Sequence, residues 1–132
     1  MHIIICLDDK NGIRFNGRRQ SKDCLLCQRI LEITKDSALW MNADSAKLFP
    51  SERVNVDENF LELAGDGGYC FAETDDFLRH ENSIEKVIVY RWNRVYPSDV
   101  KINMGFLEGK RLVGTSEFKG NSHEKITEER YE

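Results

Sequence analysis

The order of strand-like and helix-like segments constrains the fold of this chain more than any other feature. Residues 3–7 form a short run of apolar side chains, which is typical of a strand buried on both faces of a sheet. The strongest strand pattern is Val87-Ile88-Val89-Tyr90. Helix-like segments separate the strand-like ones at first, whereas beyond Asp99 the pattern contains strands only. This order predicts an α/β three-layer sandwich, with a mostly parallel central sheet and an antiparallel C-terminal strand.

The helices are predicted from capping residues and apolar spacing. Ser21 is the expected N-cap of a helix through Thr34, whose apolar stripe begins at Leu26. Shorter helices are expected over 44–49 (stopped by Pro50), after Asp57 (closed by Gly65) and over 75–80. Further strands are expected over 38–41, 54–56, 69–72, 84–92, 100–103, 111–115 and 125–131, and residues 8–17 carry turn chemistry.

Composition narrows the class of protein. The chain has 132 residues with a net charge of −4, which favours one domain over 1–132 and argues against a general nucleic-acid coat protein. No apolar run reaches the roughly 20 residues of a membrane span, and the run after Met1 is too short for a signal peptide. We therefore expect a cytoplasmic protein, with its four cysteines reduced.

Three segments resemble dihydrofolate reductase. Residues 3–17 combine a buried strand with a loop that reads Ile13-Arg14-Phe15-Asn16-Gly17, similar to the family's first strand and the mobile loop after it. Residues 87–91, followed by Asp99-Val100-Lys101-Ile102, resemble the penultimate parallel strand and its exit. Residues 116–123 resemble the last hairpin. The resemblance covers roughly 1–49 and 84–132, and it implies the same fold with a shortened middle.

The resemblance also implies a possible catalytic carboxylate and a cofactor. The family's first helix carries an acidic residue that holds the pterin ring and assists its protonation, and Asp23 is the carboxylate here that stands nearest that place. NADPH is the family's cofactor, but its phosphate-binding segment is replaced by Asn42-Ala43-Asp44-Ser45 and its glycine pair by Glu73-Thr74-Asp75-Asp76. Three carboxylates would repel a pyrophosphate, so the cofactor stays undetermined.

A basic cluster is the most unusual feature of the sequence. Arg14, Arg18, Arg19 and Lys22 lie within nine residues, uninterrupted by an acid, and end at a predicted helix start. Guanidinium groups and free N–H groups at a helix N-terminus both suit phosphate oxygens. The alternatives are a solvated charged loop and a contact with a protein or nucleic acid.

Cys24-x-x-Cys27 has the spacing of a metal or redox motif, and Cys6 and Cys70 would be the further zinc ligands if their strands are neighbours. The alternative is that these small thiols pack against the sheet.

Histidine chemistry has little support in the sequence. Similar short bacterial proteins are sometimes labelled ribonuclease Z, but the three histidines form neither His-x-His-x-Asp-His nor His-Glu-x-x-His, which disfavours that metal centre. In Ser122-His123-Glu124, neighbouring side chains of a strand point to opposite faces, so sequence order predicts no relay. Because the resemblance places these three residues in the last hairpin, a hydrogen-bonding role in a loop is expected for His123, and catalysis is the less favoured alternative.

A second dense segment, residues 91–99, follows the strongest strand. Strand carboxyl ends bind ligands in open α/β sheets, so Trp92 is a candidate for stacking on a ring, and Arg94 for binding an anion or pairing with Asp99. Asn42 follows another strand and could face the same crevice or cap a helix. The alternative for the whole segment is an aromatic and proline turn at the sheet edge.

These features predict a protein that binds a nucleotide- or pterin-like anionic ligand, with Arg14, Arg18, Arg19, Lys22, Asn42, Trp92 and Arg94 as candidate ligand-binding residues. Two alternatives stay open. One is an NAD(P)H-dependent pterin reductase in which Asp23 is catalytic. The other is a non-catalytic domain that binds a partner or self-associates into a homo-oligomer. No metal and no membrane partner is expected.

Overall fold

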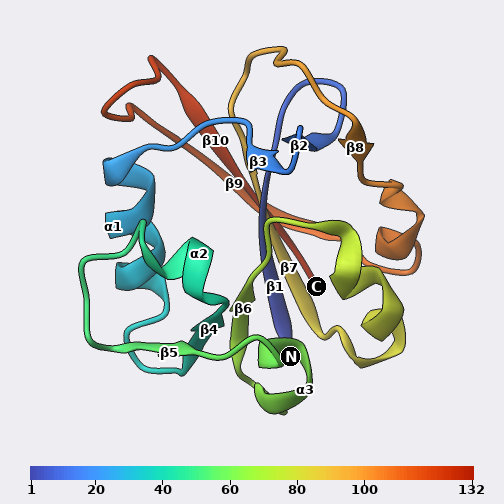
Figure 1. The fold of residues 1–132 in the computed structure, drawn as a ribbon. Helices are drawn as coiled ribbons and strands as arrows, with labels where there is room; N and C mark the ends of the chain where they lie inside the picture. Colours follow the sequence, from blue (N-terminus) through green and yellow to red (C-terminus); the bar gives the residue numbers. More distant parts are fainter.

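A seven-stranded sheet is the main feature of the computed structural model, which describes residues 1–132 (Figure 1). Its strands lie in the order β5-β4-β6-β1-β7-β10-β9. They are β1 (His2–Leu7), β4 (Leu39–Met41), β5 (Val54–Val56), β6 (Tyr69–Phe71), β7 (Lys86–Arg91), β9 (Leu112–Phe118) and β10 (Ile126–Tyr131). The five strands from β5 to β7 are parallel, while β10 pairs antiparallel with both β7 and β9. This arrangement confirms the predicted fold class.

The helices are few and short. They are α1 (Cys24–Ile33), α2 (Ala43–Ala46), α3 (Phe60–Leu63) and the 3-10 helices η1 (Asp75–Ser83) and η2 (Met104–Leu107). The predicted N-cap at Ser21 is wrong, because Asp23 caps α1 by accepting from the Leu25 and Leu26 amides. Asp23 lies one residue before the helix, where its short carboxylate reaches those orphan donors.

The segment predicted as a turn region also forms β structure. β2 (Gly12–Phe15) pairs with β3 (Arg18–Arg19) and β8 (Val100–Lys101) in a small antiparallel sheet. Asn16 and Gly17 make the tight turn between β2 and β3, both with positive φ. This hairpin carries most of the basic cluster across the carboxyl edge of the large sheet.

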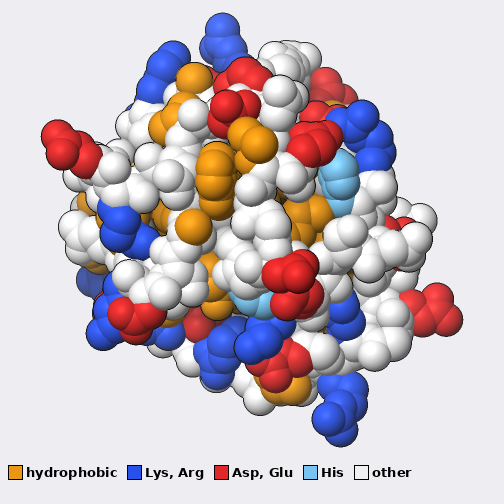
Figure 2. All heavy atoms as spheres, turned by 90° about the horizontal axis from the view of Figure 1, so that it is seen from below, with side chains coloured by type: hydrophobic (Ala, Val, Ile, Leu, Met, Phe, Trp, Pro, Cys, Tyr) orange, Lys and Arg blue, Asp and Glu red, His pale blue; other side chains and the backbone are white.

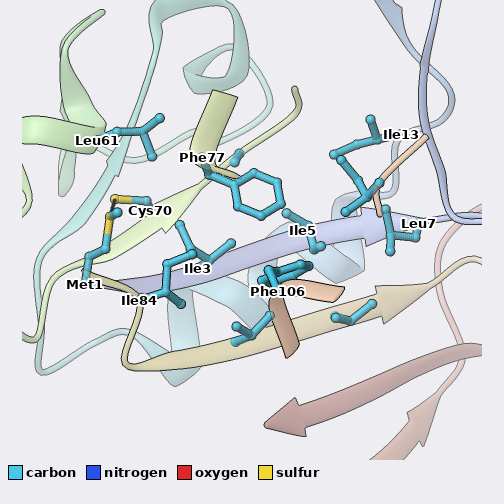
Figure 3. Close-up of a cluster of buried hydrophobic side chains, with 14 of the residues drawn as sticks. Met1, Ile3, Ile5, Leu7, Ile13, Leu61, Cys70, Phe77, Ile84 and Phe106 are labelled. Carbon is cyan, nitrogen blue, oxygen red and sulfur yellow. Dashed lines mark hydrogen bonds between the residues drawn. The ribbon is translucent and has the colours of Figure 1, made fainter. Parts of the chain in front are cut away.

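Two hydrophobic cores lie on opposite faces of the large sheet, because successive side chains of a strand alternate between its faces. Ile3, Ile5 and Leu7 of β1 pack with Phe77 and Phe106 of the 3-10 helices, as Figure 3 shows. Their neighbour Ile4 packs in the second core, with α1 and the β10 side chain Ile126. In Figure 1, α1 and the two 3-10 helices lie on opposite sides of the sheet.

A buried ion pair attaches α1 to the sheet. Glu128 of β10 is 1% exposed and accepts from Arg29 of α1, from Arg130 and from the Tyr90 hydroxyl. Burial alone would raise the pKa of Glu128, but these donors outweigh it and lower the pKa. The same burial, with the adjacent carboxylate, raises the pKa of Tyr90.

The surface at the amino ends of the parallel strands carries acidic and basic side chains mixed around a band of apolar ones (Figure 2). None of the helices is long and apolar enough to cross a membrane. The basic cluster lies at the opposite edge of the sheet, where the parallel strands have their carboxyl ends.

Candidate functional site

Polar residues converge at the carboxyl edge of the parallel strands. Asp8, Asn42, Glu73 and Trp92 follow the ends of β1, β4, β6 and β7, and α1 begins nearby at Asp23. This is the edge at which open α/β sheets bind ligands, so the site is built here from loops that the sheet positions.

Asp23 is buried at this edge, 3% exposed, and every lone pair of its carboxylate is directed at a protein donor. Oδ1 accepts from the amides of Leu25, Leu26 and Asn121 at 2.9–3.2 Å. Oδ2 accepts from the Ser122 amide and from Nδ1 of His123, both at 2.9 Å. Asp23 therefore joins the start of α1 to the loop between β9 and β10.

These donors decide the charge of Asp23. Burial acts to raise the pKa of its carboxyl, but the hydrogen bonds from Asn121, His123, Ser122 and Leu26 lower it well below the usual range. Asp23 is thus ionised near neutral pH, and it lacks an open acceptor for a ligand nitrogen. The catalytic role that the resemblance assigned to Asp23 stays a prediction.

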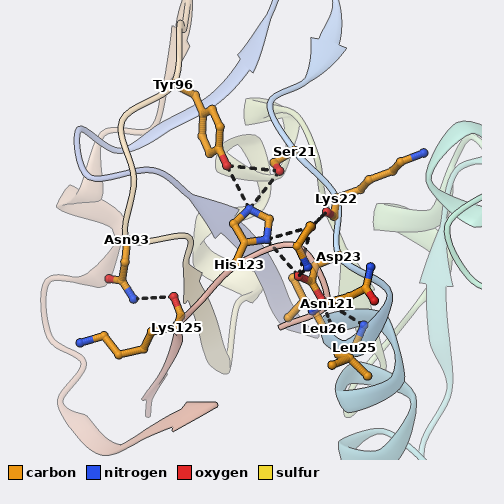
Figure 4. A network of polar contacts seen from close by, with 11 residues as sticks. Ser21, Lys22, Asp23, Leu25, Leu26, Asn93, Tyr96, Asn121, His123 and Lys125 are labelled. Atoms are coloured by element: carbon orange, nitrogen blue, oxygen red, sulfur yellow. Dashed lines mark hydrogen bonds and ion pairs between the residues drawn. The ribbon is translucent and has the colours of Figure 1, made fainter. Parts of the chain in front are cut away.

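His123 is held by polar contacts at both of its ring nitrogens, as Figure 4 shows. Its Nδ1 faces Asp23, and its Nε2 lies 3.0 Å from both the Ser21 Oγ and the Tyr96 hydroxyl. The Trp92 ring stacks on the imidazole, with centroids 4.4 Å apart and planes at 24°. Trp92 is 4% exposed, so it packs on His123 instead of offering a free stacking surface for a ligand ring.

An ion-pair network fills the centre of the edge. Arg19 donates Nε and NH2 to the two oxygens of Glu73 at 2.9 and 3.0 Å, and NH2 also reaches Asp44 at 3.0 Å. Ser45 donates its hydroxyl to Glu73 at 2.7 Å. The cavity that remains beneath, lined by Ile13, Trp92 and others, measures about 20 Å³. That volume holds roughly one water molecule, far less than a pterin ring.

The other predicted basic residues lie around this network. Arg14 donates to the carbonyls of Glu73 and Gly17. Arg18 and Lys22 are exposed, form no ion pair, and line an open hollow of about 470 Å³ together with Arg19. The structure thus brings the cluster together at the edge, where only Arg19 forms ion pairs and where the side chains of Arg18 and Lys22 have no hydrogen-bond partner either.

The last two predicted ligand-binding residues are separate from this hollow. Asn42 caps α2 by accepting from the Ser45 amide, as its alternative role anticipated. Arg94 is exposed beside Asn93 and Lys125 in another hollow, and the predicted pair with Asp99 is wrong, because Asp99 accepts from the Asn16 amide.

Asp8 is the other fully buried carboxylate of the edge. It accepts from the amides of Lys10, Gly12 and Tyr96 and from the Gln20 side chain. Although burial opposes ionisation, these donors lower its pKa. Asp8 fixes the path of the β1–β2 loop, and Gln20 keeps a buried Oε1 without a partner.

The cysteines do not form a metal centre. Cys70 lies in the core on one face of the sheet and Cys27 in the core on the other, so the zinc alternative is wrong. No group of three or more metal-ligating side chains is present. Burial raises the pKa of both the Cys27 and Cys70 thiols to about 12, whereas Cys24 is exposed.

Sequence reasoning missed that Ser21, Tyr96 and His123 meet. His123 lies in the loop between β9 and β10, where strand alternation does not apply, and its partners are 27 and 102 residues away. The only signal in the sequence was the resemblance of residues 116–123 to the last hairpin of the family.

No protein-family model matches this sequence, and no curated protein is significantly similar to it. Among solved structures, a dihydrofolate reductase from Enterococcus faecalis, complexed with NADP(H) and RAB-propyl, has a similar fold. The TM-score is 0.70 at 10% identity, over 98% of this chain and 94% of that chain. The fold is therefore dihydrofolate reductase-like, and the likeness includes the middle segment for which no motif resemblance was found.

Proposed function

We propose that this protein binds a small anionic molecule of the nucleotide or pterin class at the carboxyl edge of its sheet. The observation that carries the proposal is the hollow of about 470 Å³ that Arg18 and Lys22 line without forming an ion pair, since Asp44, the one carboxylate in its lining, pairs with Arg19. Its volume lies in the range of small-molecule sites, and guanidinium and ammonium groups are the side chains that bind phosphate and carboxylate oxygens.

The neighbouring contacts support an anion at this rim and argue against a ring buried beneath it. Arg19 is already neutralised by Glu73 and Asp44, so the free positive charge is outside, on Arg18 and Lys22. A pterin ring would enter the central cavity only if Arg19 and Glu73 separated, because that cavity measures about 20 Å³ as it stands.

A thermal-shift screen tests the proposal. NADPH, NADH, folates and nucleotides at millimolar concentration are compared, and a true ligand raises the melting temperature. The double variant Arg18→Ala/Lys22→Ala should lose the shift, and the wild-type shift should shrink with added salt. Lys35→Ala/Arg79→Ala is the matched control, because it removes the same charge from exposed positions elsewhere. The proposal fails if nothing raises the melting temperature, or if the double variant responds like wild type.

Pterin reduction is the second candidate, and the likeness to a dihydrofolate reductase bound to NADP(H) favours it. It requires Asp23 to exchange an internal donor for a ring nitrogen, and the Arg19–Glu73 pair to open. Oxidation of NADPH with dihydrofolate, followed by absorbance at 340 nm, decides between binding alone and reduction.

Self-association at a sheet edge is the third candidate. β9 is the last strand of the sheet, and its Leu112 and Val113 are 52% and 49% exposed. Unpaired edge strands with apolar side chains pair readily with a second chain. Size-exclusion chromatography with light scattering tests this, with Val113→Lys as the variant that should restore a monomer.

A further inference from the structure

Three side chains at the carboxyl edge stand in the order hydroxyl, imidazole and carboxylate. Ser21 Oγ lies 3.0 Å from Nε2 of His123, and Nδ1 of the same ring lies 2.9 Å from Oδ2 of Asp23 (Figure 4). They come from two segments a hundred residues apart in the sequence. Anion binding by Arg18 and Lys22 uses none of them.

The partners of His123 determine its protonation pattern. An ionised carboxylate only accepts hydrogen bonds, so Nδ1 of His123 carries the proton toward Asp23. In the neutral ring this leaves the lone pair of Nε2 facing the hydroxyls of Ser21 and Tyr96. The carboxylate also stabilises the ring once it is protonated, and the stacked Trp92 restricts how far the ring can turn.

Ser21 is reachable from solvent, unlike the other two residues. It is partly exposed and lines the hollow of about 470 Å³ with Arg18 and Lys22, whereas His123 and Asp23 are buried behind it. The backbone N–H groups of Ser21 and Lys22 donate to no acceptor within the protein. A hydroxyl beside a base, with free backbone donors in the same segment and open space in front, supplies the groups that acyl transfer uses.

We propose that Ser21 is the nucleophile of an ester-hydrolysing site, with His123 as the general base and Asp23 as the positioning residue. The substrate class is an ester with a small acyl group, because the cavity behind the Ser21 hydroxyl, which Ser21 also lines, measures about 20 Å³. Esters that carry a negative charge are preferred, since Arg18 and Lys22 flank the hydroxyl. This preference alone depends on the proposed anion site.

The reaction needs only the ester and water. Ser21 Oγ attacks the carbonyl carbon while Nε2 of His123 takes the hydroxyl proton. The tetrahedral intermediate then expels the alcohol, which leaves with that proton from Nε2, and the acyl group stays on Oγ as an ester. A water molecule, deprotonated by Nε2, attacks this second ester and releases the carboxylic acid. The proton returns from Nε2 to Oγ, which restores the starting state.

Covalent labelling and hydrolysis test the proposal together. A fluorophosphonate probe should label the wild-type protein at Ser21, located by peptide mass spectrometry, and p-nitrophenyl acetate should be hydrolysed above the buffer rate. Ser21→Ala and His123→Asn should both lose labelling, and their hydrolysis should fall by about 100-fold or to the buffer rate. Ser37→Ala is the matched control, an exposed serine outside the site that should label and hydrolyse as wild type does.

Two results overturn the proposal: absence of label on Ser21 in the folded wild-type protein, or wild-type hydrolysis by Ser21→Ala. Circular dichroism confirms that each variant is folded, and if His123→Asn unfolds, labelling of wild type against Ser21→Ala decides alone. The hydrolysis rate of a negatively charged ester, p-nitrophenyl hemisuccinate, tests the anion site separately. Arg18→Ala/Lys22→Ala should lower the ratio of hemisuccinate to acetate hydrolysis about tenfold. If the anion site is absent, Ser21 is still labelled and acetate is still hydrolysed. If Ser21 is not the nucleophile, the thermal-shift screen can still detect the anion site.

Discussion

Asp23 offers the sharpest test of how the carboxyl edge is held together. Replacing it with Asn keeps the size and shape of the side chain but exchanges one acceptor oxygen for an amide donor. Oδ1 accepts from three backbone amides, whereas Oδ2 accepts from the Ser122 amide, from His123 and, at 3.3 Å, from the Ser122 hydroxyl. The Asn side chain will therefore place its NH2 group at the Oδ2 position, because an imidazole and a hydroxyl can turn from donor to acceptor and a backbone amide cannot.

The cost follows from counting those donors. Two hydrogen bonds to a charged acceptor are lost, each contributing roughly 1.5–3 kcal/mol in a buried setting. His123 recovers about 1 kcal/mol by moving its proton to Nε2 and accepting from the new amide at Nδ1. The Ser122 N–H then faces the NH2 group of the new Asn side chain and has lost its acceptor. We therefore expect Asp23→Asn to lower the free energy of unfolding by about 3 kcal/mol at pH 7.

The stability difference between wild type and Asp23→Asn should depend on pH in a direction that the pKa of Asp23 sets. The folded pKa of Asp23 lies below its unfolded value of about 3.9, so its stabilising contribution is complete above that value and is lost as the pH falls toward the folded pKa. The difference between wild type and variant should be constant from pH 7 to about pH 5 and should shrink below about pH 4.

Urea unfolding, followed by far-ultraviolet circular dichroism at pH 7, 5, 4 and 3, measures the difference. Asp66→Asn is the control, because Asp66 is exposed without a hydrogen-bond or ion-pair partner, and it should change stability by less than about 0.5 kcal/mol. A loss below about 1 kcal/mol for Asp23→Asn, or a loss that stays the same from pH 7 to pH 3, would refute the reasoning.

Three further predictions concern the surroundings of the site. Glu128→Gln should lower the free energy of unfolding by about 2 kcal/mol in urea titrations, because the buried Tyr90 hydroxyl loses a charged acceptor while both arginine partners still reach water. Glu73→Ala should release Arg19 and tighten the binding of ATP about tenfold in calorimetric titrations, provided that the carboxyl edge binds anions; an unchanged or weaker affinity contradicts this. Ellman's reagent should modify Cys24 fastest in the folded protein, because it is the exposed thiol and burial raises the pKa of the half-buried Cys6; fast modification of Cys27 or Cys70 before denaturation would show that the cores open readily.

The fold was largely predictable because its strongest signals are local. A run such as Ile3–Leu7 has few alternatives to a strand buried on both faces, and it became the central strand of the sheet. The N-cap of α1 was misplaced by two residues because Ser21 and Asp23 have similar capping preferences. The hairpin of β2 and β3 was missed because Asn16-Gly17 indicates a turn without saying that the flanking residues pair.

The site was predicted as a place but not as a set of contacts. Residues after parallel strands at one edge must lie near one another, which is why Asn42 and Trp92, which follow β4 and β7, are both found there. Which atoms meet depends on loops, and the loop between β9 and β10 delivers His123 to Asp23 across a hundred residues of sequence. Strand alternation was the wrong rule for a residue outside a strand.

Charge clusters in a sequence can mislead because the fold can bring opposite charges into contact, where they neutralise one another. The basic cluster at 14–22 and the acidic cluster at 73–76 suggest separately a site that attracts anions and a site that repels them. In the structure Arg19 and Glu73 form a two-point ion pair, so neither contributes its full charge to a ligand. Arg18 and Lys22 form no ion pair and line the same hollow as Ser21. The proposed anion site and the proposed nucleophile therefore both lie at the rim of a central cleft that Arg19 and Glu73 fill. A ligand that binds here must act at the rim or break that pair first.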